Sequence, residues 1–173
     1  MLFFMHFLKR RKLMFYRIKQ FTLALTAKIN KEDQAFINQY LDREEQKLFA
    51  LLKVYEQKHA IRVAQGMATS FECDKEEMIR LGLLHDIGKI QEPLSIIEKS
   101  IMVLLHHLTR GNIKKLQSFK MIRGYYNHPQ YGYELLKKKG GYAPSFLENI
   151  RDHHLAKGGS KCFSLLQEWD DKA

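Results

Sequence analysis

The chain has 173 residues, of which 45% are hydrophobic, a composition that suits one globular domain and excludes extended disorder. No apolar run is long enough for a membrane-spanning helix, and the apolar stretch 1–8 precedes its basic cluster, the reverse of a secretory signal. We therefore expect a cytoplasmic protein in which Cys73 and Cys162 stay reduced.

The formal charge of +10 is concentrated at the N-terminus. Residues 1–28 hold seven basic residues and no acid, whereas the rest of the chain holds 22 basic and 19 acidic residues. The same stretch carries apolar residues at helical spacing, namely Phe3, Phe4, Phe7, Phe15, Ile18, Phe21 and Leu25. This predicts a basic amphipathic arm over 1–28 that contacts an anionic membrane peripherally, at its inner face. The alternative is that the part from Phe15 onward packs on the remaining domain.

Helix starts are marked along the chain by a capping residue with an acid three positions later. Asn30 with Asp33, Asp42 with Glu45, and Asp74 with Glu77 each follow this pattern. The third of these helices is expected to run to His85.

Apolar periodicity predicts the remaining helices. One stripe runs through Leu48, Leu52, Tyr55, His59 and Val63, and a second through Ile97, Ile101, Leu104, Leu105 and Leu108. Further helices are expected to begin near Pro129, with His128 at the start, and at Pro144, and a last segment has Phe163, Leu166 and Asp170 on one face. No alternating strand pattern is found. We predict an all-α fold, a single helical bundle over residues 29–173.

Polar residues of the metal-ligating type lie on faces that are otherwise apolar. They are His59, His85, Asp86, His128, His153, His154 and Asp170. Imidazoles and carboxylates grouped in this way suit divalent ions. His106 and His107 have no companion acid and are interpreted as structural.

The order of these residues resembles the H…HD…D signature of the HD superfamily of metal-dependent phosphohydrolases. LGLLHDIGKI from Leu81 is similar to the HDIG subgroup, and NHPQYGYELL from Asn127 resembles the HPxxG element of HD-GYP phosphodiesterases. IRDHH, which ends at His154, and the C-terminal LLQEWDDKA resemble two further elements of that group. The resemblance covers Glu56 to the C-terminus and implies a helical HD domain.

By this resemblance, His59, His85, Asp86 and Asp170 would hold one divalent ion, with Asp171 as an alternative to Asp170. His128, His153 and His154 would complete a second site bridged by Asp86. We expect one or two ions, Mn or Fe first, with Mg, Zn, Ni or Co as alternatives. Asp86 and Lys89 are the predicted catalytic residues: Lys89 would contact a phosphate oxygen, and its alternative role is to offset a helix dipole.

Several departures from the resembling groups bear on substrate. LAKGGS follows His154 in place of a GYP loop, and the HDxxED, HDxGH and HDIAK patterns of other HD hydrolases, the last that of diadenosine tetraphosphate hydrolases, do not match HDIGK. The expected function is hydrolysis of a nucleotide or related phosphate ester, with no specific nucleic acid binding and no indication of oligomeric state. The alternative is a non-catalytic nucleotide-sensing or membrane-associated regulatory HD domain.

Overall fold

The protein is described from a computed structural model over residues 22, 25–70, 74–155 and 161–173. This part of the chain folds into helices joined by short loops and has no strand, as the sequence predicted. Most of the predicted N-terminal arm, residues 1–21 and 23–24, lies outside it, as does the LAKGGS stretch from residue 156. No described helix is both long and apolar enough to cross a membrane.

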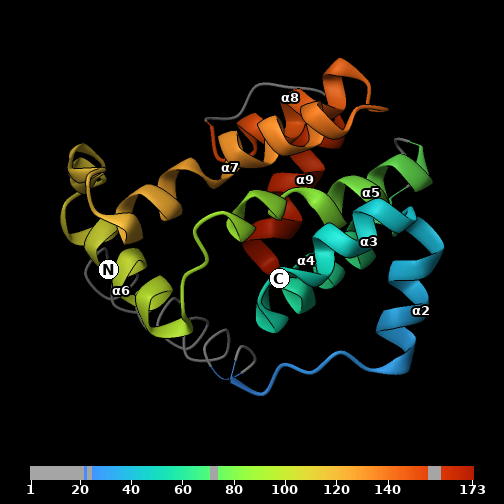
Figure 1. Cartoon of the computed structure of the whole chain (residues 1–173), viewed down its shortest axis with the longest axis horizontal. Coiled ribbons are helices and arrows are strands. Elements are labelled where there is room, and N and C mark those ends of the chain that lie inside the picture. Colours follow the sequence, from blue (N-terminus) through green and yellow to red (C-terminus); the bar gives the residue numbers. More distant parts are fainter. Residues whose placement is uncertain (1–21, 23–24, 71–73, 156–160) are drawn as a thin grey trace, which may run out of the picture.

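The helices follow one another with short connections (Figure 1). In chain order they are α2 (Lys31–Tyr40), α3 (Arg43–Ala50), α4 (Val54–Met67), α5 (Lys75–Leu84), the 3-10 helix η1 (Ile87–Ile90), α6 (Ile96–Leu108), the 3-10 helix η2 (Asn112–Leu116), α7 (Lys120–Lys139), α8 (Pro144–Asp152) and α9 (Lys161–Lys172). The predicted caps are confirmed. Asn30–Asp33 and Asp42–Glu45 form reciprocal capping boxes, and the Asp74 side chain accepts from the amide of Glu77.

The core lies between α4, α5, α8 and α9, with α2 and α3 closing one end of the molecule and α6 and η2 lying at the other (Figure 1). Helices α4 and α5 form the most extensive helix pair. A Cβ at Gly82 would lie 2.7 Å from the Cα of Ala64, so the absence of a side chain on α5 allows this close packing. On the other face of α4, Gly66 leaves room for the Trp169 ring, which seats α9 against α4.

Glu45 joins two helices, α3 and α5, to the α7–α8 connection at the closed end of the bundle. Its fully buried carboxylate accepts hydrogen bonds from the Tyr142 hydroxyl at 2.6 Å and from the Arg80 guanidinium at 2.7 Å, and it also caps α3. A buried carboxylate without such partners would be strongly destabilising, so this network favours one arrangement of α3, α5 and the α7–α8 connection.

Three expectations differ from the structure. The stripe from Leu48 to Val63 is not one helix, because α3 ends at Ala50 and α4 begins at Val54, and the buried Gln57 amide bonds the Leu52 carbonyl at the break. His128 and Pro129 lie inside α7, eight residues or more after its start. Cys162 is disulfide-bonded, where two reduced thiols were expected; Cys73 lies outside the described residues.

Candidate metal centre

All seven predicted ligands come together at the centre of the bundle. They are contributed by α4 (His59), the end of α5 (His85 and Asp86), the middle of α7 (His128), the end of α8 (His153 and His154) and α9 (Asp170). They form two groups that share Asp86, and within each group one ligand atom per residue lies within 4.8 Å of the others. Asp171, the alternative to Asp170, is exposed on α9 and belongs to neither group.

The first group consists of His59, His85, Asp86 and Asp170. His59 Nε2 lies 2.9 Å from Asp170 Oδ1, and His85 Nε2 lies 3.5 Å from the same oxygen. His85 Nε2 is also 3.3 Å from Asp86 Oδ2. Two imidazole nitrogens and two carboxylates therefore converge on one point.

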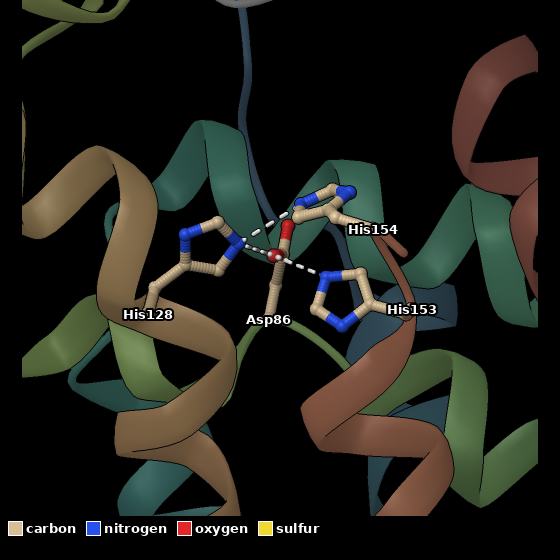
Figure 2. A group of neighbouring side chains, drawn as sticks. All are labelled: Asp86, His128, His153 and His154. Atoms are coloured by element: carbon tan, nitrogen blue, oxygen red, sulfur yellow. Dashed lines mark hydrogen bonds and ion pairs between the residues drawn. The ribbon is translucent and has the colours of Figure 1, made fainter. Parts of the chain in front are cut away.

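The second group surrounds the other oxygen of Asp86 (Figure 2). His128 Nε2 lies 3.1 Å and His153 Nε2 3.7 Å from Asp86 Oδ1, and the Nε2 atoms of His128 and His154 are 3.1 Å apart. Asp86 Oδ1 thus faces the second group, whereas Oδ2 faces the first. A carboxylate with one oxygen in each group can bridge two cations.

Three of the histidines are oriented by their own helices. The Nδ1 atoms of His85, His128 and His153 each bond the backbone carbonyl three residues earlier, at 2.8, 2.9 and 2.7 Å respectively. A carbonyl can only accept, so each Nδ1 carries the proton and each Nε2 presents a lone pair to the centre. Metal-binding histidines are typically held by such outer hydrogen bonds.

The His128 bond depends on Pro129. In a regular helix the amide of residue 129 would donate to the Tyr125 carbonyl, but proline has no amide hydrogen. The His128 ring takes that carbonyl instead. The proline expected to open a helix therefore lies inside one, where it frees the acceptor that orients a candidate ligand.

Buried polar atoms without hydrogen-bond partners test whether this donor set suits a cation. In the described part of the chain there are four such side-chain atoms, and three are His85 Nε2, Asp86 Oδ1 and His153 Nε2. Native proteins rarely bury unsatisfied polar atoms. Lone pairs aimed at a shared point are satisfied by a cation, so the residues fit a site for divalent ions.

The charges of the centre also favour a cation. Burial raises the pKa of Asp86 and Asp170, but it is outweighed at Asp86 by Lys89 and the neighbouring histidines and at Asp170 by His59 and His85. Both carboxyls therefore have a pKa well below the ordinary value. Burial lowers the pKa of His85, yet Asp86 and Asp170 reverse this and raise it to about 10. The two buried carboxylates thus favour positive charge at this position, which a bound divalent ion would supply in place of a proton on His85.

Two groups that the sequence interpretation missed extend the centre. Glu56, almost fully buried, forms ion pairs with Lys89 at 3.0 Å and with Lys99 at 2.8 Å, and Lys89 also contacts Asp86. Burial raises the pKa of Glu56, but the two lysines together lower it to about 2. The spacing could have indicated Glu56, because it lies three residues before His59 and so on the same face of α4. Lys99 had no comparable signal.

The remaining histidine predictions concern α6. His106 Nδ1 bonds the Tyr126 hydroxyl at 2.8 Å, and His107 is exposed. Neither belongs to a metal-type group in the described residues.

A helical bundle with a buried cluster of His and Asp side chains that could hold two divalent ions is typical of one class of helical metalloproteins. Within that class, the HD domain family model matches residues 57–172. The chain therefore belongs to the HD family, whose members are metal-dependent phosphohydrolases. No curated protein and no solved structure was found to match the chain.

Proposed function

We propose that this protein is a metal-dependent phosphohydrolase that cleaves a nucleotide or a related phosphate ester at a centre of two divalent ions. The observation that supports the proposal most directly is the position of Asp86, whose two carboxylate oxygens face two separate groups of ligands. A domain that only binds a nucleotide has no need of a second group.

His59, His85 and Asp170 would hold one ion, and His128, His153 and His154 the other, with Asp86 between them. Ions bound there would polarise phosphate oxygens and lower the pKa of water. The donor set contains imidazole and carboxylate and no thiolate, which favours Mn or Fe and also admits Mg, Zn, Ni or Co.

Lys89 is proposed to contact a phosphate oxygen of the substrate. Its ammonium group lies between the carboxylates of Asp86 and Glu56, and burial lowers its pKa while these carboxylates raise it well above the ordinary value, so it remains charged. Cations at the centre would compete for Asp86. Lys89 would then share Glu56 with Lys99, which leaves two ammonium groups on one carboxylate and an excess of positive charge for a phosphate. The alternative of a lysine offsetting a helix dipole does not account for two buried carboxylate partners.

Linear nucleotide phosphates are the proposed substrates, ahead of cyclic di-GMP. The support is the LAKGGS sequence after His154, where the HD-GYP phosphodiesterases that the chain resembles have a GYP loop. We also propose that the chain belongs to the HDIG subgroup, which its LGLLHDIGKI sequence resembles. A hydrolysis screen over linear and cyclic nucleotides, with several divalent ions, would rank these substrates by turnover. Faster turnover of cyclic di-GMP than of linear nucleotides would contradict the proposed preference.

The basic arm over residues 1–28 is proposed to attach the HD domain, residues 29–173, to an anionic membrane and to play no part in the chemistry. Its seven positive charges and apolar residues support this. We propose a cytoplasmic location, peripheral at the inner face of the membrane; the disulfide at Cys162 is an exception to the reduced thiols typical of that compartment.

The decisive experiment compares Asp86→Asn with Asp171→Asn, a matched carboxylate on the exposed side of α9. We expect Asp86→Asn to lose metal by elemental analysis and to lose hydrolysis while retaining helicity, and Asp171→Asn to retain all three. Full activity in Asp86→Asn would show the site assignment to be wrong. A wild-type protein that binds metal but hydrolyses no phosphate ester in the screen would favour a non-catalytic regulatory domain.

A further inference from the structure

Helix α6 presents a row of large apolar side chains to solvent. Ile97, Ile101, Leu104 and Leu108 are spaced by four, three and four residues, which places them on one narrow face of the helix. Ile97 is 66% exposed, Leu104 58% and Leu108 71%. Leu116 at the end of η2 and Phe119 just before α7 are also more than half exposed. We call these six residues the α6 face.

The described part of the fold does not use the α6 face. Met102 is the one buried residue of α6, and it points away from the row. No residue of α6 belongs to the main core cluster of the described residues, and the helix packs mainly on α7 and η2 at the end of the molecule opposite α2 and α3 (Figure 1). Contiguous apolar surface of this kind on a folded domain marks a site of interaction.

The charges around the α6 face are mostly positive. From Lys99 to Tyr133 the sequence contains no acidic residue, and Arg110, Lys114, Lys115 and Lys120 are all exposed within this stretch. One acid, Glu98, is exposed on α6 itself, about 100° around the helix from Ile97, where it forms the capping box with Ser95 and interacts with the charge of Lys120. The surface therefore combines apolar side chains with exposed cations.

We propose that the α6 face and these four basic residues form a membrane-binding surface for anionic phospholipid. Apolar side chains would enter the boundary between headgroups and acyl chains, while the cations contact the phosphates. Charge argues against the two other occupants available to the chain. The arm over residues 1–28 carries seven basic residues and no acid, and a second copy would bring two identical basic clusters together, so both would be repelled.

The test uses the full chain and vesicles of equal parts phosphatidylglycerol and phosphatidylcholine, followed by sedimentation. One variant is Leu104→Ser with Leu108→Ser, and a second is Lys114→Gln with Lys115→Gln. Matched controls are Leu51→Ser with Val54→Ser on the α3–α4 connection, and Lys137→Gln with Lys138→Gln at the end of α7, all exposed. The mutated side chains are exposed and lie outside both metal-type groups, so metal content and circular dichroism should match wild type in every variant.

We expect the leucine variant to bind vesicles about tenfold or more weakly than wild type, because two large apolar side chains no longer leave water. The lysine variant should bind more weakly too, and wild-type binding should fall when salt rises from about 0.1 M to about 1 M. Both controls should bind as wild type does. Neutral phosphatidylcholine vesicles should bind little of any protein.

Three results would overturn the proposal. The first is unchanged vesicle binding in the leucine variant, or no binding by wild type, which would leave the arm alone or no membrane contact at all. The second is a wild-type dimer in sedimentation velocity that the leucine variant dissociates, which would make a second copy the occupant. The third is that, without lipid, the α6 amides are protected from hydrogen exchange and lose this protection when Lys9, Arg10, Arg11 and Lys12 are changed to Gln. That result would make the arm the occupant of the α6 face. None of these results bears on the metal centre, so the proposed function is tested separately.

Discussion

Gly88 lies directly against the backbone of His128. A Cβ at position 88 would be 2.0 Å from the His128 carbonyl oxygen and 2.3 Å from the Gly132 amide nitrogen. The φ angle of Gly88 is not in the left-handed region, so the close approach of η1 to α7 is what requires a glycine here. The glycines of the HDIG and HPxxG motifs, Gly88 and Gly132, therefore face each other, and His128 Nε2 lies 3.1 Å from Asp86 Oδ1 beside them.

Gly88→Ala should separate the two groups of ligands. The added methyl would push η1 from α7, destabilise the protein by about 1–3 kcal/mol, and move His128 away from Asp86. We expect urea unfolding to show that loss and elemental analysis to show less bound metal, with the first group of ligands still occupied. Wild-type stability together with wild-type metal content would contradict the packing argument.

His128→Ala should lower the metal ratio from about two per chain to about one, because it removes a ligand that serves the second group only. His106→Ala is the matched control, since His106 is also a helical histidine with a ring hydrogen bond but lies outside both groups. Elemental analysis of both variants decides the question. A ratio near one in wild type would leave a single site of His59, His85, Asp86 and Asp170.

Pro129→Ala should raise the stability of the protein and lower its affinity for metal. Alanine restores the amide that bonds the Tyr125 carbonyl, so α7 should become more stable, by up to about 3 kcal/mol. The same amide would compete with His128 Nδ1 for that carbonyl, and the loss of an orienting bond typically weakens metal binding about tenfold or more. Chelator competition measures the affinity, and urea unfolding the stability. If affinity stays at the wild-type value, the carbonyl does not orient His128.

Glu56→Gln should make stability less dependent on acid pH. The pKa of Glu56 is lowered in the fold to about 2, so its contribution to stability is fully present above the unfolded value near 4.5 and is lost as pH falls through 2. A shift of this size corresponds to about 3 kcal/mol at neutral pH.

The measurement is the difference in unfolding free energy between metal-free wild type and Glu56→Gln at pH 7 and at pH 3. We expect the difference to be smaller at pH 3. The stability that ionised Glu56 contributes to wild type is lost as pH falls from the unfolded pKa near 4.5 to the folded pKa near 2, and pH 3 lies within this interval. Lys47→Gln, which removes an exposed ion pair with Glu44, provides a control that should change stability little at either pH. A difference between wild type and Glu56→Gln that does not change with pH would show that Glu56 is not held ionised by the two lysines.

What the sequence determined by itself was the local structure. The helix caps at Asn30, Asp42 and Asp74 depend on hydrogen bonds within a few residues, so they can be read directly from the order of side chains. The grouping of ligands was predicted through resemblance to a family, since His59 and Asp170 are 111 residues apart and no local rule brings them together.

Only the tertiary structure decided how the centre is completed. The end of α3 depends on Gln57 and on burial of Leu52, whereas Pro129 is tolerated within α7 where the His128 ring bonds the free carbonyl. Lys99 reaches Glu56 from a different helix, 43 positions later. These features depend on packing and on electrostatic interactions between segments that are far apart in the sequence. Such segments are adjacent only after the chain has folded, so local sequence patterns do not predict their contacts.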